Sequence, residues 1–142
     1  MQDRFSWANQ VYGGEMAANK IEEYLIDLMY TFREVEPNFW IIEDPEHGLD
    51  GVAVLFADPL VIIRVQVMDA PQEKRLEFFT KLLELNASDL FHGAYGLDKE
   101  KIVLIHTLEY DTLDYSEFRA ALDALSLALT QHYPVLSAYR GH

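Results

Sequence analysis

Two extended runs joined by a tight reversal make up the sequence GVAVLFADPLVIIRVQVM, residues 51–68. Residues 51–57 are almost all apolar, which is typical of a strand that is buried on both faces. Residues 60–68 alternate in polarity with the period of two of a β-strand. Because only Asp58 and Pro59 separate the two runs, we expect them to form an antiparallel pair.

A third extended run precedes this pair, and a helix precedes the third run. Residues 39–42 are aromatic and β-branched, and the turn-rich residues 43–51 connect them to the next strand. The three runs therefore predict an antiparallel meander. Upstream, an apolar stripe with helical spacing predicts a helix over residues 15–33, and Pro37 forbids much further helix. The stripe consists of Ile21, Leu25, Leu28 and Phe32.

A second helix follows the meander, with Pro71 in its first turn and Asn86 as its stop. Phe78 is expected to point away from the apolar stripe of this helix. Residues 91–97 and 102–108 are the fourth and fifth extended runs. The stripe is formed by Leu76, Phe79 and Leu83, and is widened by Leu82 and Leu85.

A third helix begins at a capping box. Asp114 can accept a hydrogen bond from the backbone N–H of Glu117, and the Glu117 side chain can reach back to the backbone of Asp114. Pro134 is expected to end this helix. Its apolar stripe consists of Phe118, Leu122, Leu125 and Leu129.

These elements predict an α+β fold with the order α-βββ-α-ββ-α and a five-stranded, mainly antiparallel sheet with helices packed on it. The chain of 142 residues has the size of one domain, residues 1–142. It divides into an arm over residues 1–15, a core over residues 16–135 and a tail over residues 136–142. The arm carries aromatic and aliphatic side chains, which we expect to pack back on the same domain, before a break at a glycine pair. These residues are Phe5, Trp7, Val11, Tyr12, Gly13 and Gly14.

The charge and the cysteine content exclude several classes of protein. The chain carries 24 acidic and 11 basic residues, a net charge of −13, so nucleic acid and anionic membranes are poor partners. The charge favours solubility, or a surface for a basic or unfolded polypeptide. No cysteine is present, which excludes disulfides and thiolate chemistry. No apolar run approaches the ~20 residues of a membrane span, so we expect a cytoplasmic protein.

No constellation of side chains predicts catalysis, a metal ion or a cofactor. The five histidines lack metal-ligand spacing, and the glycines form no phosphate-binding loop. One group of acidic residues lies in the loop of residues 43–50. Another contains Glu109, Asp111 and Asp114, which leaves open a small metal-dependent enzyme as a less favoured alternative. Both groups fit turns and a helix N-terminus, where carboxylates are common. We therefore predict no catalytic, metal or cofactor-binding residue.

The apolar residues of the second helix and the following strand exceed what one helix–strand contact requires. They predict a surface for a second copy or a partner, with an ordinary core as the equal alternative. An open sheet also has edges, to which an extended peptide can add as a strand. The residues of this predicted surface are Phe78, Leu82, Leu85, Phe91 and Tyr95.

The end of the second helix resembles a known family. The sequence Leu82-Leu83-Glu84-Leu85-Asn86 is followed by Gly93, Gly96-Leu97 and Ile102-Val103-Leu104. This succession, with the element order over about residues 16–135, is similar to the type III secretion chaperones (the Tir chaperone, or CesT-like, family) and to the related YbjN-like family. The resemblance implies a homodimer built through the second helix and the next strand, without catalysis. It also implies that a partner's N-terminal segment wraps the dimer as extended chain.

The combined expectation is a non-enzymatic, dimeric protein-binding module that holds an extended segment of a partner polypeptide, as secretion chaperones do. The alternative of another class is a regulatory or sensory domain of YbjN-like type, which modulates other proteins without escorting them.

Overall fold

The hairpin of β3 (Leu49–Ala57) and β4 (Leu60–Asp69) forms the middle of the fold in a computed structural model, which describes residues 3–8 and 19–140. All residues from Val52 to Phe56 are buried. The prediction of an antiparallel pair with an apolar first strand is confirmed, because residues 52–57 of β3 pair with residues 60–65 of β4.

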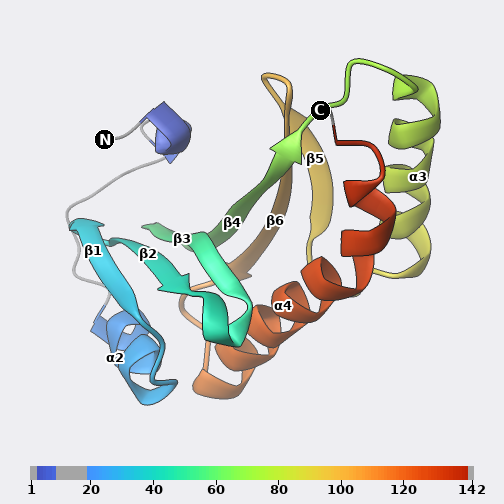
Figure 1. Ribbon diagram of the computed structural model, residues 1–142. Coiled ribbons are helices and arrows are strands. Elements are labelled where there is room, and N and C mark those ends of the chain that lie inside the picture. The colour runs from blue at the N-terminus through green and yellow to red at the C-terminus, as the bar shows by residue number, and fades with distance from the viewer. Residues whose placement is uncertain (1–2, 9–18, 141–142) are drawn as a thin grey trace.

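The sheet has six strands rather than the predicted five. They lie in the order β1-β2-β3-β4-β6-β5, and every neighbouring pair is antiparallel (Figure 1). β5 and β1 are therefore the two edge strands. The remaining elements are η1 (Asp3–Phe5), α2 (Asn19–Asp27), β1 (Phe32–Glu36), β2 (Phe39–Asp44), η2 (Pro45–His47), α3 (Arg75–Ser88), β5 (Ala94–Asp98), β6 (Lys101–Glu109) and α4 (Tyr115–Ser137).

The additional strand is β1, whose first two residues lie inside the region predicted as the first helix. α2 ends at Asp27, and Met29 takes a left-handed conformation with φ of 62°, which stops the helix. Phe32 then pairs with Ile42 of β2. Phe32 follows Leu28 by four residues, so it continued the helical period in the sequence although it belongs to a strand. The predicted helix start at residues 15–18 lies outside the described residues.

The helices cover one face of the sheet, and the N-terminal arm covers part of the other. In Figure 1, α4 crosses the sheet diagonally and α3 stands beside β5. The inward side chains of the sheet and of α2, α3 and α4 form one continuous core. On the opposite face, Phe5 and Ala8 are buried against Phe39 and Leu55. The arm thus packs back on its own chain over residues 3–8, as predicted, while Val11, Tyr12, Gly13 and Gly14 lie outside the described residues.

Three further predicted helix boundaries were wrong. α3 continues past the predicted stop at Asn86 to Ser88. Pro71 precedes α3 instead of lying in its first turn, because Lys74 has a left-handed φ of 56° and helical geometry starts only at Arg75. Pro134 lies inside α4, which continues to Ser137. The last turn persists because Leu136 is buried in the core, and such packing outweighs the local cost of proline. The capping box of Asp114 and Glu117 is confirmed.

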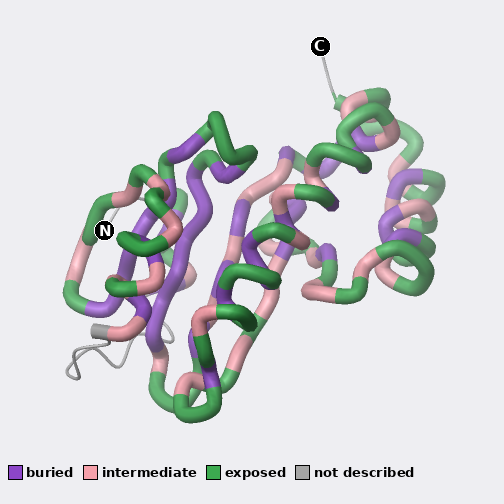
Figure 2. The backbone as a smooth tube through the Cα atoms, turned by 90° about the horizontal axis from the view of Figure 1, so that it is seen from below, coloured by how far each residue is buried: buried purple, intermediate pink, exposed green. Residues whose placement is uncertain are grey.

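The tube in Figure 2 shows buried residues along the strands and exposed residues on the outer turns of the helices. No helix within residues 3–8 and 19–140 is both long and apolar enough to cross a membrane.

Candidate partner-binding surface

α3 is apolar on two faces, and the structure buries the face that carries Phe78, Leu82 and Leu85. Phe78, Leu82 and Leu85 are buried, whereas Leu76 is 82% exposed and Leu83 is 68% exposed. The prediction that Leu76 and Leu83 face the core and that Phe78 points away was therefore wrong. Both sets have helical spacing, so periodicity alone cannot distinguish them.

Phe78 packs α3 against the residues that follow α4. Its ring lies 5.1 Å from that of Tyr139, in an edge-to-face arrangement. The Tyr139 hydroxyl donates a hydrogen bond of 2.8 Å to the Glu77 carboxylate. This hydrogen bond raises the pKa of Tyr139, because it favours the protonated phenol. The contact orients α3 and leaves its opposite face open.

Contacts among three polar side chains connect β5 with α4 and with the end of α3. The Tyr95 hydroxyl lies 2.7 Å from Nδ1 of His132, and Nε2 of His132 lies 3.4 Å from a carboxylate oxygen of Asp89. Burial raises the pKa of the Tyr95 phenol, so its hydroxyl stays protonated beside Nδ1. Tyr95 therefore has a structural partner inside its own chain.

The free edge of β5 is blocked by Asn86. Its side-chain amide accepts a 2.8 Å hydrogen bond from the backbone N–H of Tyr95 and donates a 3.1 Å bond to the backbone carbonyl of the same residue. The side chain thus takes the place of a neighbouring strand in the middle of β5. Natural sheets protect their edges in this way against pairing with other chains. In the sequence, Asn86 was predicted only as a helix stop, and this role was not foreseen.

Four of the five residues predicted as a dimer or partner surface lie in the core of the chain: Phe78, Leu82, Leu85 and Tyr95 are buried. Phe91, in the loop between α3 and β5, is 93% exposed. Any contact of these five residues with a second chain stays a prediction. Leu76 and Leu83 of α3 and Phe91 of the following loop are exposed apolar side chains, and we name these three residues the α3 patch.

A groove lies between β4 and the last turns of α4. It has a volume of about 580 Å³. Val67 and Leu129 contribute apolar wall, and Tyr133 and Arg140 lie at the α4 side. The Arg140 guanidinium carbon lies 5.5 Å from the centre of the Tyr133 ring, so the cation sits beside an aromatic side chain. Because Asp50 also lines the groove, both signs of charge are present, and the groove suits an apolar side chain followed by a polar group.

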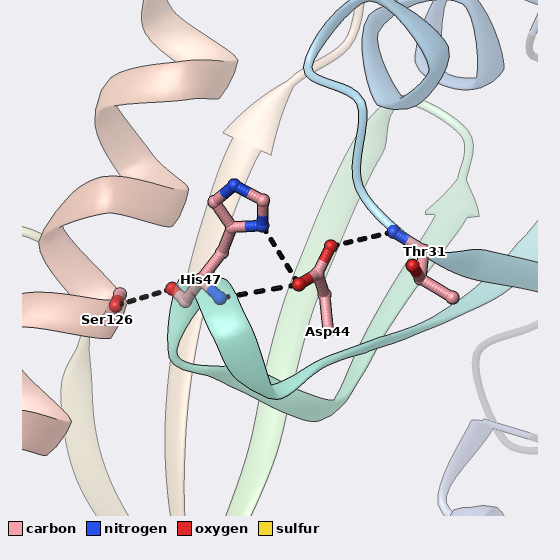
Figure 3. Close-up of polar contacts among 4 residues, drawn as sticks. All are labelled: Thr31, Asp44, His47 and Ser126. Atoms are coloured by element: carbon pink, nitrogen blue, oxygen red, sulfur yellow. Dashed lines mark hydrogen bonds and ion pairs between the residues drawn. The ribbon is translucent and has the colours of Figure 1, made fainter.

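The carboxylates of the loop after β2 serve the fold. Asp44 accepts hydrogen bonds from the backbone N–H of Thr31 at 2.8 Å and of His47 at 3.3 Å, and its carboxylate lies 2.8 Å from Nδ1 of His47 (Figure 3). The bond from Thr31, followed by the contacts to His47, lowers the pKa of Asp44 despite its burial. Ser126 of α4 donates a 2.9 Å bond to the carbonyl of His47 (Figure 3), which joins the loop to the helix.

The second acidic group serves a helix end. Asp114 caps α4 through a 2.8 Å bond from the N–H of Glu117, while Glu109 and Asp111 are exposed. Within the described ranges, no three histidine or acidic side chains come together as a set that could hold a metal ion. The structure therefore gives Asp114 a capping role.

Comparison with known proteins identifies the class. The chain matches the CesT_Tir_1 family over residues 15–142, and it belongs to that family. A search of curated protein sequences returns no match. The predicted resemblance to the type III secretion chaperones of the CesT-like family is thus confirmed.

Solved structures share the fold at low sequence identity. A chain of the heterodimeric ExoU–SpcU complex, from the type III secretion system of Pseudomonas aeruginosa, has a TM-score of 0.67 and 16% identity, over 82% of this chain and 97% of that chain. YbjN of E. coli, proposed as a transcription regulator, has a TM-score of 0.64 and 17% identity, over 84% and 92%. The HopA1–SchA chaperone–effector complex contains a chain with a TM-score of 0.58 and 7% identity, over 80% and 91%.

Proposed function

We propose that this protein is a non-enzymatic, homodimeric binding module that holds an extended segment of a partner polypeptide, in the manner of a secretion chaperone. The observation that carries the proposal is the open apolar face of α3, on a chain that belongs to the CesT_Tir_1 family. A helix that is apolar on two sides has one side left for a second molecule. In the dimer, the α3 patch of one chain meets the same patch of its partner about a two-fold axis.

The partner segment lies along the groove between β4 and α4. Addition as a strand at β5 is opposed by Asn86, which already occupies the backbone groups of Tyr95. The other edge, β1, carries the charged residues Arg33, Glu34 and Glu36, which disfavour pairing with a further strand. The groove offers apolar wall at Val67 and Leu129 and therefore binds the apolar side chains of an extended chain.

The net charge of −13 favours a partner segment that carries basic residues. A segment that carries basic residues among its apolar ones is drawn to an acidic molecule, and its encounter rate rises at low salt. The protein is expected to escort such a segment in its unfolded form.

A regulatory role of YbjN-like type is the second candidate. The similarity to YbjN, with a TM-score of 0.64, favours it. In that case the protein contacts a folded target for a short time and does not hold an unfolded segment.

Site-specific photo-crosslinking in the native cell tests the proposal. A photoreactive phenylalanine analogue in place of Tyr133 is expected to capture one polypeptide, because Tyr133 lies on the wall of the groove. Limited proteolysis and mass spectrometry then locate the crosslink, which should fall near one end of the partner in a segment that is unfolded when free.

The same analogue in place of Glu23, an exposed residue of α2, is the matched control. Equal capture at both positions would contradict binding in the groove. A crosslink from Tyr133 to the surface of a folded domain would favour the regulatory candidate instead.

A further inference from the structure

The outer face of the sheet holds a cavity in which basic side chains gather, although the protein as a whole is acidic. It has a volume of about 400 Å³, within the range of small-molecule sites. The arm, β4 and the turn between β5 and β6 supply its walls. Four of the 11 basic residues of the chain line it, against one carboxylate: the cations are Arg4, Arg64, Lys99 and Lys101, and the carboxylate is Asp98.

Arg64 is the fixed cation of this cavity. Its side chain is only 15% exposed, and its guanidinium carbon lies 4.6 Å from the centre of the Trp7 ring. One of its nitrogens forms an ion pair of 2.5 Å with Asp98. The stacking and the ion pair hold the guanidinium in one orientation, and a planar guanidinium presents several N–H donors in a fixed fork.

Two other cations carry charge that no described carboxylate neutralises. Arg4 and Lys99 form no ion pair within residues 3–8 and 19–140, although each lines the cavity. Lys99 lies in the tight turn before β6, where φ is 49° at Lys99 and 66° at Glu100. Such a two-residue turn holds the lysine at a defined place above the sheet.

The N-terminal arm forms one wall of the cavity. Gly51 has a φ of 75°, and a Cβ atom there would lie 2.9 Å from a guanidinium nitrogen of Arg4. Glycine at this position therefore leaves the space in which the Arg4 side chain lies. Ser6 of the arm and Gln66 of β4 add neutral hydrogen-bonding groups to the lining.

We propose that this cavity binds the phosphate group of a small molecule. Guanidinium and ammonium donors around a small, half-open cavity match a compact, doubly charged oxyanion. The net charge of −13 selects against a nucleic acid, because its many phosphates outside the cavity would meet an acidic surface. The inference does not rest on the proposed function, since the α3 patch contributes no residue to the lining of the cavity and the groove shares only Gln66 with it.

Calorimetric titration of the full chain tests this inference. The probes are inorganic phosphate, pyrophosphate, ATP and citrate, each at the same total ionic strength adjusted with sodium chloride. We expect saturable, one-to-one binding of a phosphate compound. Equal affinity for pyrophosphate and ATP assigns recognition to the phosphate alone, and tighter binding of ATP assigns it to a nucleotide.

Lys99→Glu should weaken the binding at least about tenfold, since a hydrogen bond between charged groups contributes at least that factor. The matched control is Lys74→Glu, because Lys74 is also exposed, has a similar φ of 56° and lies outside the cavity. Arg4→Gln is a second variant, which alters the arm instead of the turn and should also weaken binding.

Absence of saturable binding for every phosphate compound would overturn the proposal. So would equal losses in Lys99→Glu and Lys74→Glu, or tighter binding of citrate than of any phosphate compound. None of these outcomes would affect the crosslink at Tyr133, so the two proposals fail separately.

Discussion

Asp44 shows at the scale of a residue how a carboxylate in an acidic loop can be structural. Its two oxygens accept bonds from the backbone of Thr31 and of His47, and so join the start of β1 to the turn after β2. In the sequence, Asp44 is one of a group of loop carboxylates. Only the structure shows that Asp44 is buried while its neighbour Glu46 is exposed. The signal that could have singled it out is the Asp-Pro pair before a helical turn, since Asp44 also caps η2.

Asp44→Asn should destabilise the fold at neutral pH, and its effect should shrink in acid. The lowered pKa of Asp44 means that the ionised carboxylate stabilises the folded state. That contribution is fully present above the pKa of the unfolded chain, about 4, and is lost as the pH falls through the lower folded pKa. Urea unfolding of both proteins from neutral pH down to about pH 3 checks this, with Glu46→Gln as control. A difference between wild type and Asp44→Asn that stays constant down to the lowest pH would contradict the assignment.

At the scale of an element, α3 was predicted as a helix correctly and oriented wrongly. Both its exposed and its buried leucines recur at helical spacing, so spacing cannot orient the helix. Tertiary contacts, such as that of Phe78 with Tyr139, fix which side of α3 faces inward. β1 shows a related ambiguity. Its first residue continues the stripe of α2, and it becomes a strand because β2 offers a partner across the turn at residues 37–38. Neither choice is made by local sequence.

Adjacent leucines in α3 should respond differently to truncation. Leu82→Ala removes a buried side chain and should lower the free energy of unfolding by about 2–5 kcal/mol. Leu83→Ala removes an exposed side chain and should change it by less than about 0.5 kcal/mol in the monomer. Chemical denaturation at concentrations where the protein is monomeric measures both values. Equal losses would mean that α3 is turned differently on its sheet.

The whole molecule combines a strongly acidic charge with an apolar patch. Two copies with a charge of −13 each repel one another, so the proposed dimer depends on the α3 patch to overcome the repulsion. Salt screens exposed charges, with a Debye length of about 10 Å at 0.1 M. The dissociation constant of the dimer should therefore fall as the salt concentration rises.

Sedimentation velocity at micromolar concentration measures this effect. Leu83→Glu should give a monomer at every salt concentration, because it places a charge in the apolar contact. Leu127→Glu, at an exposed leucine of α4, is the control and should still dimerise. A wild-type monomer under all conditions, or a Leu83→Glu dimer, would exclude the α3 patch as the interface.

Much of the architecture follows from patterns that local physics makes unambiguous. The alternation in β4, the apolar run of β3 and the capping box of α4 each arise from groups that are close in sequence, and each was predicted correctly. The secretion-chaperone resemblance of residues 82–104 was confirmed by the family match over residues 15–142. The candidate site was less predictable, because its open apolar side chains, its groove and the block at Asn86 depend on contacts between distant segments.

The amino-acid sequence by itself determined which segments are helical or extended wherever a single period was present, and it determined the family. Only the tertiary structure decided that residues 32–36 are a sixth strand, which leucines of α3 stay exposed, and that Pro134 lies within a helix. The physical reason is that burial and strand pairing are gained between segments far apart in the chain. Where two local patterns are nearly equal in free energy, those distant contacts select one of them.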